Sequence, residues 1–186
     1  MLIFIGASAS GKSDIAKILI NEYRFKKMVT TTTRKKRANE VQHVDYHFTT
    51  INRFKKKQDN NYYGTPKKGA DLNKVLIVDP DGANSIYDHH INNVVFFYLE
   101  TDEEVRKKRM LERGDNLIEV IDRLEKDEKH FMRSNLKHID YVINTNEGTQ
   151  EEIALQIATL YDNHINNDNQ MSIFDVFRED EWKEKK

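Results

Sequence analysis

The chain has 186 residues, and its 30 Lys and Arg against 31 Asp and Glu give a formal net charge of −1. This balance excludes a globally basic nucleic-acid-binding protein, and the absence of cysteine excludes disulfides, thiolate catalysis and Cys-ligated zinc. The length favours one domain with a sizeable core. No stretch has the length of a membrane helix and no leader precedes the first apolar run, so we expect a cytoplasmic protein without nucleic-acid or membrane partners.

The N-terminal segment predicts a phosphate-binding loop between a strand and a helix. The apolar run Leu2–Ile5 predicts a buried strand, and Asp14–Tyr23 carries apolar residues at helical spacing. Between them lies Gly6-Ala-Ser-Ala-Ser-Gly11-Lys12-Ser13, which fits the pattern G-x-x-x-x-G-K-[ST]. An ordinary turn rich in Gly and Ser is the alternative, but every fixed position of the pattern is filled.

The chemistry of this loop predicts a site for a nucleoside triphosphate. Small residues let backbone N–H groups surround a phosphate, and the N-terminus of the following helix adds partial positive charge. The Lys12 ammonium can reach the β- and γ-phosphates, and the Ser13 hydroxyl can ligate Mg²⁺. The residues expected to bind the triphosphate are Gly6, Ala7, Ser8, Ala9, Ser10, Gly11, Lys12 and Ser13.

Further β-like and helical segments alternate along the chain. We expect strands at Val75–Val78, Val94–Leu99 and Tyr141–Ile143. We expect helices at Asp102–Arg113, Leu117–Asn135 and Gln150–Asn163. Thr101 is typical of an N-cap for the first of these helices. The alternation predicts a parallel central sheet in a three-layer α/β sandwich of the P-loop type.

The stretch Thr30–Asn73 interrupts this alternation and indicates an insertion with short strands. Within it, Arg34 and Arg37 can form a second phosphate site, because the planar guanidinium group binds phosphate oxygens in a bidentate manner. Tyr62 and Tyr63 can bond a phosphate or stack on a base. A solvated basic loop and aromatic packing inside the insertion are the structural alternatives.

Two further groups carry charges that suit a nucleotide site. Asp79 follows an apolar run, and ligands bind at the carboxyl ends of parallel strands, so Asp79 can contact a base or a magnesium-bound water. Arg109 and Arg113 lie four residues apart on one helix face and can close over a transferring phosphoryl group. A turn-forming acid and a salt-bridged helix surface are the alternatives.

The composition changes near Asn163 and becomes rich in Asn and Asp. We therefore expect residues 164–186 to form a C-terminal extension. Its apolar side chains can dock on the core or on a second subunit, and a frayed terminus is the alternative. A monomer and a homodimer are both compatible with this sequence.

The order of these motifs resembles that of guanylate kinases, within the nucleoside monophosphate kinase family. The segments that match after the phosphate loop are Thr32-Thr33-Arg34…Arg37…Glu40-Val41, Asp45-Tyr46-His47-Phe48, Tyr62-Tyr63-Gly64, Asp79-Pro80-Asp81-Gly82, Lys107-Lys108-Arg109…Arg113-Gly114 and Asp140-Tyr141-Val142-Ile143-Asn144. The resemblance spans roughly residues 1–161 and implies one domain over residues 1–163. It implies a core of residues 1–29, 74–113 and 127–163, a monophosphate-binding lobe at 30–73 and a lid at 114–126.

The resemblance also implies a reaction and a role for the matching residues. The reaction is phosphorylation of GMP, and of dGMP, by ATP with Mg²⁺ through in-line transfer. The residues implied to stabilise the transferring phosphoryl group are Lys12, Arg109, Arg113 and Arg123. The residues implied to bind GMP are Thr30, Arg34, Arg37, Tyr46, Tyr63, Thr65 and Asp79. Asn144 is implied to lie near ATP, while Ser13 is the expected ligand of Mg²⁺ and Asp79 can reach the ion through water.

One departure from the family pattern concerns the base. Between Phe48 and Tyr62, where the family carries a glutamate that reads guanine, this chain has no glutamate, and Asp59 is the nearest acid. Unpaired polar groups on a base weaken selectivity. A (deoxy)nucleoside monophosphate kinase of different or broader base specificity is therefore one alternative. A non-catalytic guanylate-kinase-like binding module is the other, and the intact Gly11-Lys12-Ser13 argues against it.

Overall fold

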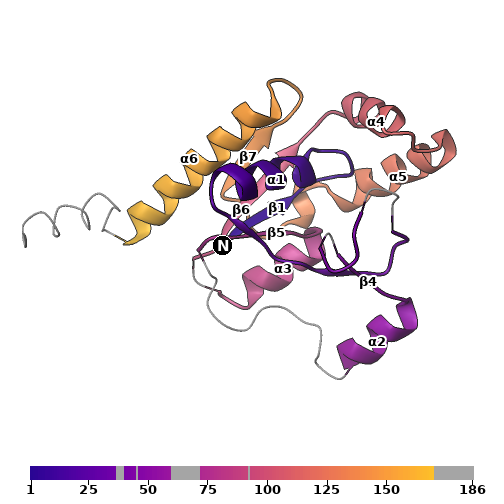
Figure 1. The fold of residues 1–186 in the computed structure, drawn as a ribbon, viewed down its shortest axis with the longest axis horizontal. Helices are drawn as coiled ribbons and strands as arrows, with labels where there is room; N and C mark the ends of the chain where they lie inside the picture. Colours follow the sequence, from indigo (N-terminus) through magenta and orange to yellow (C-terminus); the bar gives the residue numbers. More distant parts are fainter. Residues whose placement is uncertain (37–39, 45, 60–71, 92, 170–186) are drawn as a thin grey trace, which may run out of the picture.

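The computed structural model describes residues 1–36, 40–44, 46–59, 72–91 and 93–169. Its centre is a five-stranded parallel sheet with the order β2-β5-β1-β6-β7 (Figure 1). The strands are β1 (Leu2–Ile5), β2 (Lys26–Lys27), β5 (Lys74–Ile77), β6 (Val95–Glu100) and β7 (Tyr141–Asn144). Helices cover both faces of this sheet, so the predicted three-layer α/β sandwich with a parallel sheet is confirmed.

Strand β1 occupies the middle of the sheet because its residues are apolar toward both faces. Leu2 pairs in parallel with Val75 of β5 and with Val95 of β6. All four residues of β1 are fully buried, as expected for a strand covered on both sides. The segment that follows β1 therefore starts at the centre of the carboxyl edge of the sheet, where open α/β proteins bind their ligands.

The two faces of the sheet have different covers (Figure 1). Helices α1 (Lys12–Glu22) and α6 (Gln150–Asn169) pack against the face that carries Phe4. Helix α3 (Pro80–Asp88) packs against the opposite face, which carries Ile3. The alternation of side chains along β1 thus supplies one apolar residue after another to two separate cores.

Helices α4 (Glu103–Glu112) and α5 (Leu117–His130) pack on one another at one end of the molecule. A small separate cluster of buried residues joins them, made of Met110, Val120 and Leu124. Ala9 of the segment after β1 is packed against the same cluster. This packing fixes α4 and α5 beside the carboxyl edge of the sheet.

Helix α3 is absent from our sequence prediction, which names no helix between the strands at Val75–Val78 and Val94–Leu99. The helix begins at Pro80, and Asp79 is its N-cap, accepting a hydrogen bond from the Gly82 amide at 2.8 Å. Proline at the first helical position and an aspartate before it are both favourable at a helix start. The sequence therefore contains a start signal for this helix that the prediction did not use.

The insertion contains the short strands that we predicted and a helix that we did not predict. Strands β3 (Thr31–Thr32) and β4 (His47–Phe48) form a separate two-stranded parallel sheet. Helix α2 (Ile51–Asp59) follows and projects away from the central sheet (Figure 1). Its three lysines and its exposed Ile51 leave no clear apolar stripe, which is why periodicity did not reveal it.

Helix ends also differ from the prediction in three places. The predicted helix to Asn135 ends at His130, and a short 3₁₀ turn, η1 (Arg133–Asn135), follows. The N-cap of α4 is Asp102 and not Thr101, whose hydroxyl instead contacts that of Thr145 at 2.5 Å. Helix α6 continues to Asn169, six residues beyond the predicted end.

No helix within the described ranges is both long and apolar enough to cross a membrane.

The hydroxyl of buried Tyr98 in β6 donates to the carbonyl of Phe131 at 2.6 Å. Burial, followed by the nearby Glu100 carboxylate, raises the pKa of Tyr98 above its ordinary value of 10.0. A phenol with a raised pKa in the folded chain contributes stability below about pH 10, and this contribution is lost as the pH rises through the folded pKa.

We expect Tyr98→Phe to lower the free energy of unfolding by about 1 kcal/mol near pH 8. The difference from the wild type should shrink as the pH rises above about 10, because only the wild type must break the Tyr98 hydrogen bond on ionisation. Urea unfolding of both proteins at each pH measures this difference. The exposed Tyr87→Phe is the matched control, and a constant difference across the pH range would contradict the prediction.

Candidate active site

The phosphate loop leaves the carboxyl end of β1 and turns directly into α1. Gly6 and Gly11 have φ values of +154° and +89°, which favour glycine, and Ala9 adopts a left-handed conformation with φ +61°. Lys12 is the first residue of α1, and Ser13 follows with an exposed side chain. The predicted sequence of strand, loop and helix is therefore present.

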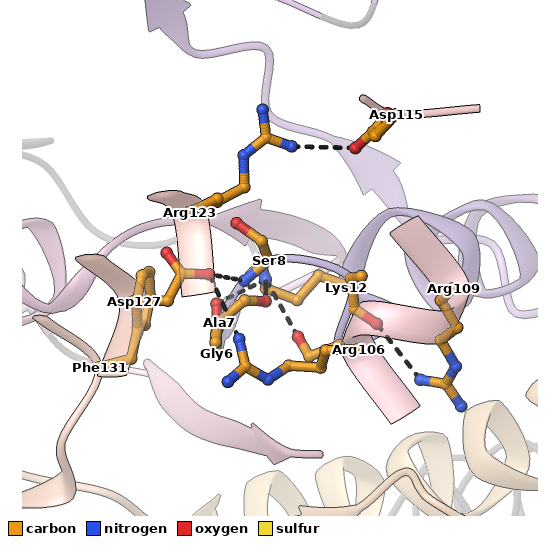
Figure 2. A network of polar contacts seen from close by, with 12 residues as sticks. Gly6, Ala7, Ser8, Lys12, Arg106, Arg109, Asp115, Arg123, Asp127 and Phe131 are labelled. Atoms are coloured by element: carbon orange, nitrogen blue, oxygen red, sulfur yellow. Dashed lines mark hydrogen bonds and ion pairs between the residues drawn. The ribbon is translucent and has the colours of Figure 1, made fainter. Parts of the chain in front are cut away.

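The Lys12 ammonium folds back over this loop (Figure 2). It donates to the carbonyl oxygens of Gly6 at 2.5 Å and Ala7 at 2.6 Å, and to the hydroxyl of Ser10 at 3.0 Å. Its Nζ atom lies 6.0 Å from the centre of the Phe131 ring. These contacts hold a positive charge at the loop, where a bound polyphosphate would carry its negative charge.

Helix α4 directs Arg109 to the same loop (Figure 2). Its Nη1 donates to the carbonyl of Ala9 at 3.3 Å, and its Nη2 donates to the carbonyl of Thr145 at 2.7 Å. Thr145 is buried after β7, and its hydroxyl donates to the Ser10 carbonyl at 3.3 Å. Sequence reasoning missed Thr145, because its contact with the loop depends on where β7 joins the sheet.

Arg113 and Arg123 both donate to the carboxylate of Asp115, and Figure 2 shows the contact of Arg123. Arg113 donates to Oδ2 through Nε at 2.9 Å and also through Nη2, and Arg123 Nη1 donates to the same oxygen at 3.2 Å. Two guanidinium groups from different helices can thus share one anionic oxygen. Asp115 was not predicted, although an acid between two arginine-bearing helices is a recognisable signal.

Asn144 ends β7 at the carboxyl edge of the sheet. Its Oδ1 accepts a hydrogen bond from the Asn146 amide at 2.8 Å, and Asn146 Oδ1 accepts one from the Asp102 amide at 2.8 Å. The side chain of Asn144 therefore stabilises the turn beside Thr145, the residue that contacts the phosphate loop.

Within the insertion, Arg34 forms a bidentate ion pair with Glu40. Arg34 Nη1 donates to Oε2 at 2.7 Å, and Nη2 donates to Oε1. The hydrogen bond to Glu40, opposed in part by burial, raises the pKa of Arg34 above its ordinary value, so the side chain stays charged. Its guanidinium carbon lies 5.1 Å from the Tyr46 ring centre and 5.5 Å from that of Phe48, within cation–π range.

A second cation, Lys27, also lies against Tyr46. Its Nζ atom is 5.3 Å from the ring centre, and both residues line a small cavity with Thr30. The Thr30 carbonyl accepts a hydrogen bond from the His47 amide at 2.8 Å. Sequence reasoning missed Lys27, because a strand of two residues such as β2 has no recognisable pattern.

Asp79 is exposed, and its Oδ1 atom is engaged as the N-cap of α3. In this structure Asp79 therefore stabilises the start of α3, directly after the carboxyl end of β5. Three predicted site residues lie outside the described residues: Arg37, Tyr63 and Thr65.

Gly6 is the point at which the loop comes closest to the neighbouring strand. A Cβ atom there would lie 2.6 Å from the Leu99 carbonyl oxygen and 2.9 Å from Ser10 Oγ, at a φ unfavourable to other residues. We expect Gly6→Ala to lower the free energy of unfolding by about 2–3 kcal/mol, from the clash and the backbone strain together.

Gly114→Ala is the matched control for this substitution. Gly114 has φ +87°, but a Cβ there would meet no atom of the described residues within 4 Å. Backbone strain alone then costs about 1 kcal/mol. Urea unfolding measures both variants, and equal losses would show that the close contact at Gly6 does not matter.

Comparison with known proteins places the chain in a family. The family model for guanylate kinases matches residues 1–163. A guanylate kinase of Clostridium acetobutylicum is 33% identical over 76% of this chain and 73% of its own length, and one of Rickettsia bellii is 32% identical over 86% and 92%. The crystal structure of guanylate kinase from Anaplasma phagocytophilum has the same fold, with a TM-score of 0.59, 21% identity and coverage of 86% of this chain and 82% of that one. The chain therefore belongs to the guanylate kinase family and is a phosphotransferase of the nucleoside monophosphate kinase type.

Proposed function

We propose that this protein transfers the γ-phosphoryl group of ATP to GMP, and to dGMP, giving ADP and the nucleoside diphosphate. One observation carries the proposal: the structure has two separate cationic sites. Lys12 and Arg109 contact the phosphate loop, and Arg34 lies beside Tyr46 in the insertion. The names of the curated relatives support GMP as the acceptor monophosphate.

The proposed reaction asks for positioning and charge neutralisation more than for covalent chemistry. An oxygen of the acceptor monophosphate attacks the γ-phosphorus of ATP, and the bond from that phosphorus to the β-phosphate oxygen breaks. Lys12 and Arg109 would neutralise the charge from the side of the loop. Arg113, directly before the lid at residues 114–126, and Arg123 within it would add to this by exchanging the Asp115 carboxylate for phosphoryl oxygens.

Magnesium enters this scheme as part of the donor substrate, the ATP–Mg²⁺ complex. Ser13 fits the ion because its hydroxyl is a hard oxygen donor, exposed at the start of α1. Asp79 is exposed at the end of the neighbouring strand β5 and suits a water ligand of the ion. Bound Mg²⁺ would neutralise charge on the β- and γ-phosphates.

The remaining assignments follow from the family resemblance. We assign residues 30–73 to a lobe for the acceptor monophosphate, and the rest of residues 1–163 to the core and the lid. The lobe residues assigned to its phosphate are Arg34, Arg37, Tyr46 and Tyr63. The residues assigned to its base are Thr30, Thr65 and Asp79. Asn144 is assigned to the donor nucleotide, at the turn after β7.

A second candidate differs only in the base of the acceptor monophosphate. The chain has no glutamate between Phe48 and Tyr62. A buried guanine N1–H and amino group without an acceptor would weaken selectivity for guanine. The candidate is a nucleoside monophosphate kinase with different or broader base specificity.

An ADP-release assay with ATP–Mg²⁺ separates the two candidates. The acceptors to compare are GMP, dGMP, AMP, dAMP, CMP, UMP and dTMP, with the same preparation of Lys12→Met as the blank for contaminating kinases. We expect kcat/KM for GMP and dGMP to exceed that for the other acceptors. Comparable turnover of several bases supports broader specificity, and turnover confined to another base contradicts GMP as the substrate.

A further inference from the structure

Asp127 of α5 contacts the phosphate loop from the interior of the protein. Its Oδ2 atom accepts a hydrogen bond from the Ser8 amide at 2.6 Å, and Arg106 Nη1 lies 3.5 Å from the same oxygen (Figure 2). Both charged residues are buried, with 8% of Asp127 and 6% of Arg106 exposed. No role in the reaction has been assigned to this pair.

Burying this ion pair between α4 and α5 has a large free-energy cost. Two charges removed from water must overcome a large desolvation penalty, and apolar side chains of similar volume often stabilise a protein as well or better. Arg106 Nε is buried without a hydrogen-bond partner among the described residues, which adds to the cost. Stability alone therefore does not account for this buried ion pair. The hydrogen bond from the Ser8 amide to Asp127 suggests instead that the pair acts on the phosphate loop.

Asp127 and Arg106 each lie on the same helix as an arginine that is proposed to bind the transferring phosphoryl group. Asp127 lies four residues after Arg123 on α5, and Arg106 lies three residues before Arg109 on α4, so each charge shares a helix face with one arginine. The Asp127 carboxylate is the point where α4, α5 and the loop meet. A change there would alter where both arginines stand relative to the loop.

We propose that Asp127 is a positioning residue for phosphoryl transfer. Its hydrogen bond from the Ser8 amide fixes the loop to α5, which packs on α4, and thereby places Arg109 and Arg123 over the bound ATP. The inference rests on the proposed roles of these two arginines. It identifies Asp127 as acting through other residues, without contact with the substrate. The carboxylate is needed as a hydrogen-bond acceptor for Ser8, and Arg106 is needed to compensate its buried charge.

Two double variants separate this role from a structural one. Arg106→Met/Asp127→Leu removes both charges and the acceptor for Ser8. Arg106→Met/Asp127→Asn also removes both charges but keeps a side-chain oxygen that can accept from the Ser8 amide. We expect the first variant to fold, with kcat lowered about tenfold and the KM for ATP raised about tenfold, because small misplacements near reacting groups are costly. The second variant should recover most of both losses, and neither should change the KM of the acceptor monophosphate.

The kcat and the KM for ATP are measured with the acceptor monophosphate for which the wild type has the highest kcat/KM. Thermal unfolding confirms that the variants are folded. Wild-type kinetics in the Leu variant, or equal losses in both variants, would overturn the proposal. Lys137→Gln/Asp88→Asn, which removes an exposed ion pair far from the loop, is the control and should change nothing. Calorimetry of ATP–Mg²⁺ binding gives a readout without turnover, so failure of the GMP proposal would leave this test intact.

One measurement on the wild type covers the case in which the variants do not fold. Amide hydrogen exchange followed by NMR should show a protected Ser8 amide, because a buried charge-assisted hydrogen bond must open before exchange. Exchange at the rate of an unstructured peptide would overturn the proposal.

Discussion

Replacing Lys12 by Met is expected to lower kcat by about 10³-fold while the protein remains folded. The ammonium is held at the loop by the Gly6 and Ala7 carbonyls and the Ser10 hydroxyl, so its charge stands in place before ATP binds. Charge on the transferring phosphoryl oxygens must be balanced as the bond to ADP breaks, and a fixed cation does this without reorganisation. The Met side chain keeps much of the volume beside Phe131, while the charge and its hydrogen bonds to the loop are lost.

The matched control is Lys17→Met, which removes a lysine charge from the same helix. The Lys17 side chain is 64% exposed and pairs with Asp14 at 3.7 Å, so we expect unchanged kinetics and stability. Steady-state rates at saturating ATP and acceptor monophosphate measure kcat, and thermal unfolding measures the fold. A Lys12→Met enzyme within tenfold of the wild-type kcat would show that the loop lysine does not stabilise the transition state.

The parts of this molecule that the sequence predicts well are those decided by local chemistry. The loop at Gly6–Ser13 could be predicted because its glycines and Lys12 answer requirements of phosphate binding that appear in a short pattern. Strand β1 and residues Val95–Leu99 of strand β6 are continuously apolar, so their burial on both faces follows directly. The parallel sheet then follows from the helices between the strands.

The parts that it did not predict depend on contacts between distant segments. Asp127 and Ser8 are 119 residues apart, and nothing near either residue indicates that a carboxylate will meet a loop amide. Thr145 likewise reaches the loop only after β7 has paired with β6. Helix α3 was missed for another reason, because its local start signal, Asp79 followed by Pro80, was considered as a candidate ligand site and not as a helix cap.

The candidate site likewise contains residues that could be predicted from the sequence and residues whose role depends on distant contacts. The groups expected to touch nucleotide, such as Lys12 and Arg34, could be named from the sequence, because their chemistry resembles that of a known family. The groups that hold such side chains in place, for example Glu40 beside Arg34 and Asp115 between Arg113 and Arg123, became visible from the structure. Binding chemistry is thus readable from residue types, whereas pre-organisation depends on three-dimensional contacts.

Replacing Arg34 by Ala is expected to raise the KM of the acceptor monophosphate by about 10²-fold, with a smaller effect on kcat at saturation. Arg34 donates twice to Glu40 and once to the Lys35 carbonyl, so its planar group is oriented within the insertion and can present donors to a phosphate. The variant would lose these donors and would also remove the Arg34 cation from the Glu40 carboxylate, an anion in the lobe that binds the dianionic acceptor.

Two further variants resolve the separate causes. Arg34→Lys keeps the charge but lacks the planar group that binds Glu40 in a bidentate manner, so we expect an intermediate KM. Arg34→Ala/Glu40→Gln removes the negative charge of Glu40 as well and should recover part of the loss. Arg53→Ala on α2, where the side chain is exposed, is the matched control and should leave the KM unchanged. Because Arg34 lies far from the phosphate loop in sequence and belongs to the insertion, an unchanged acceptor KM in Arg34→Ala would remove the case for a monophosphate-binding lobe at residues 30–73.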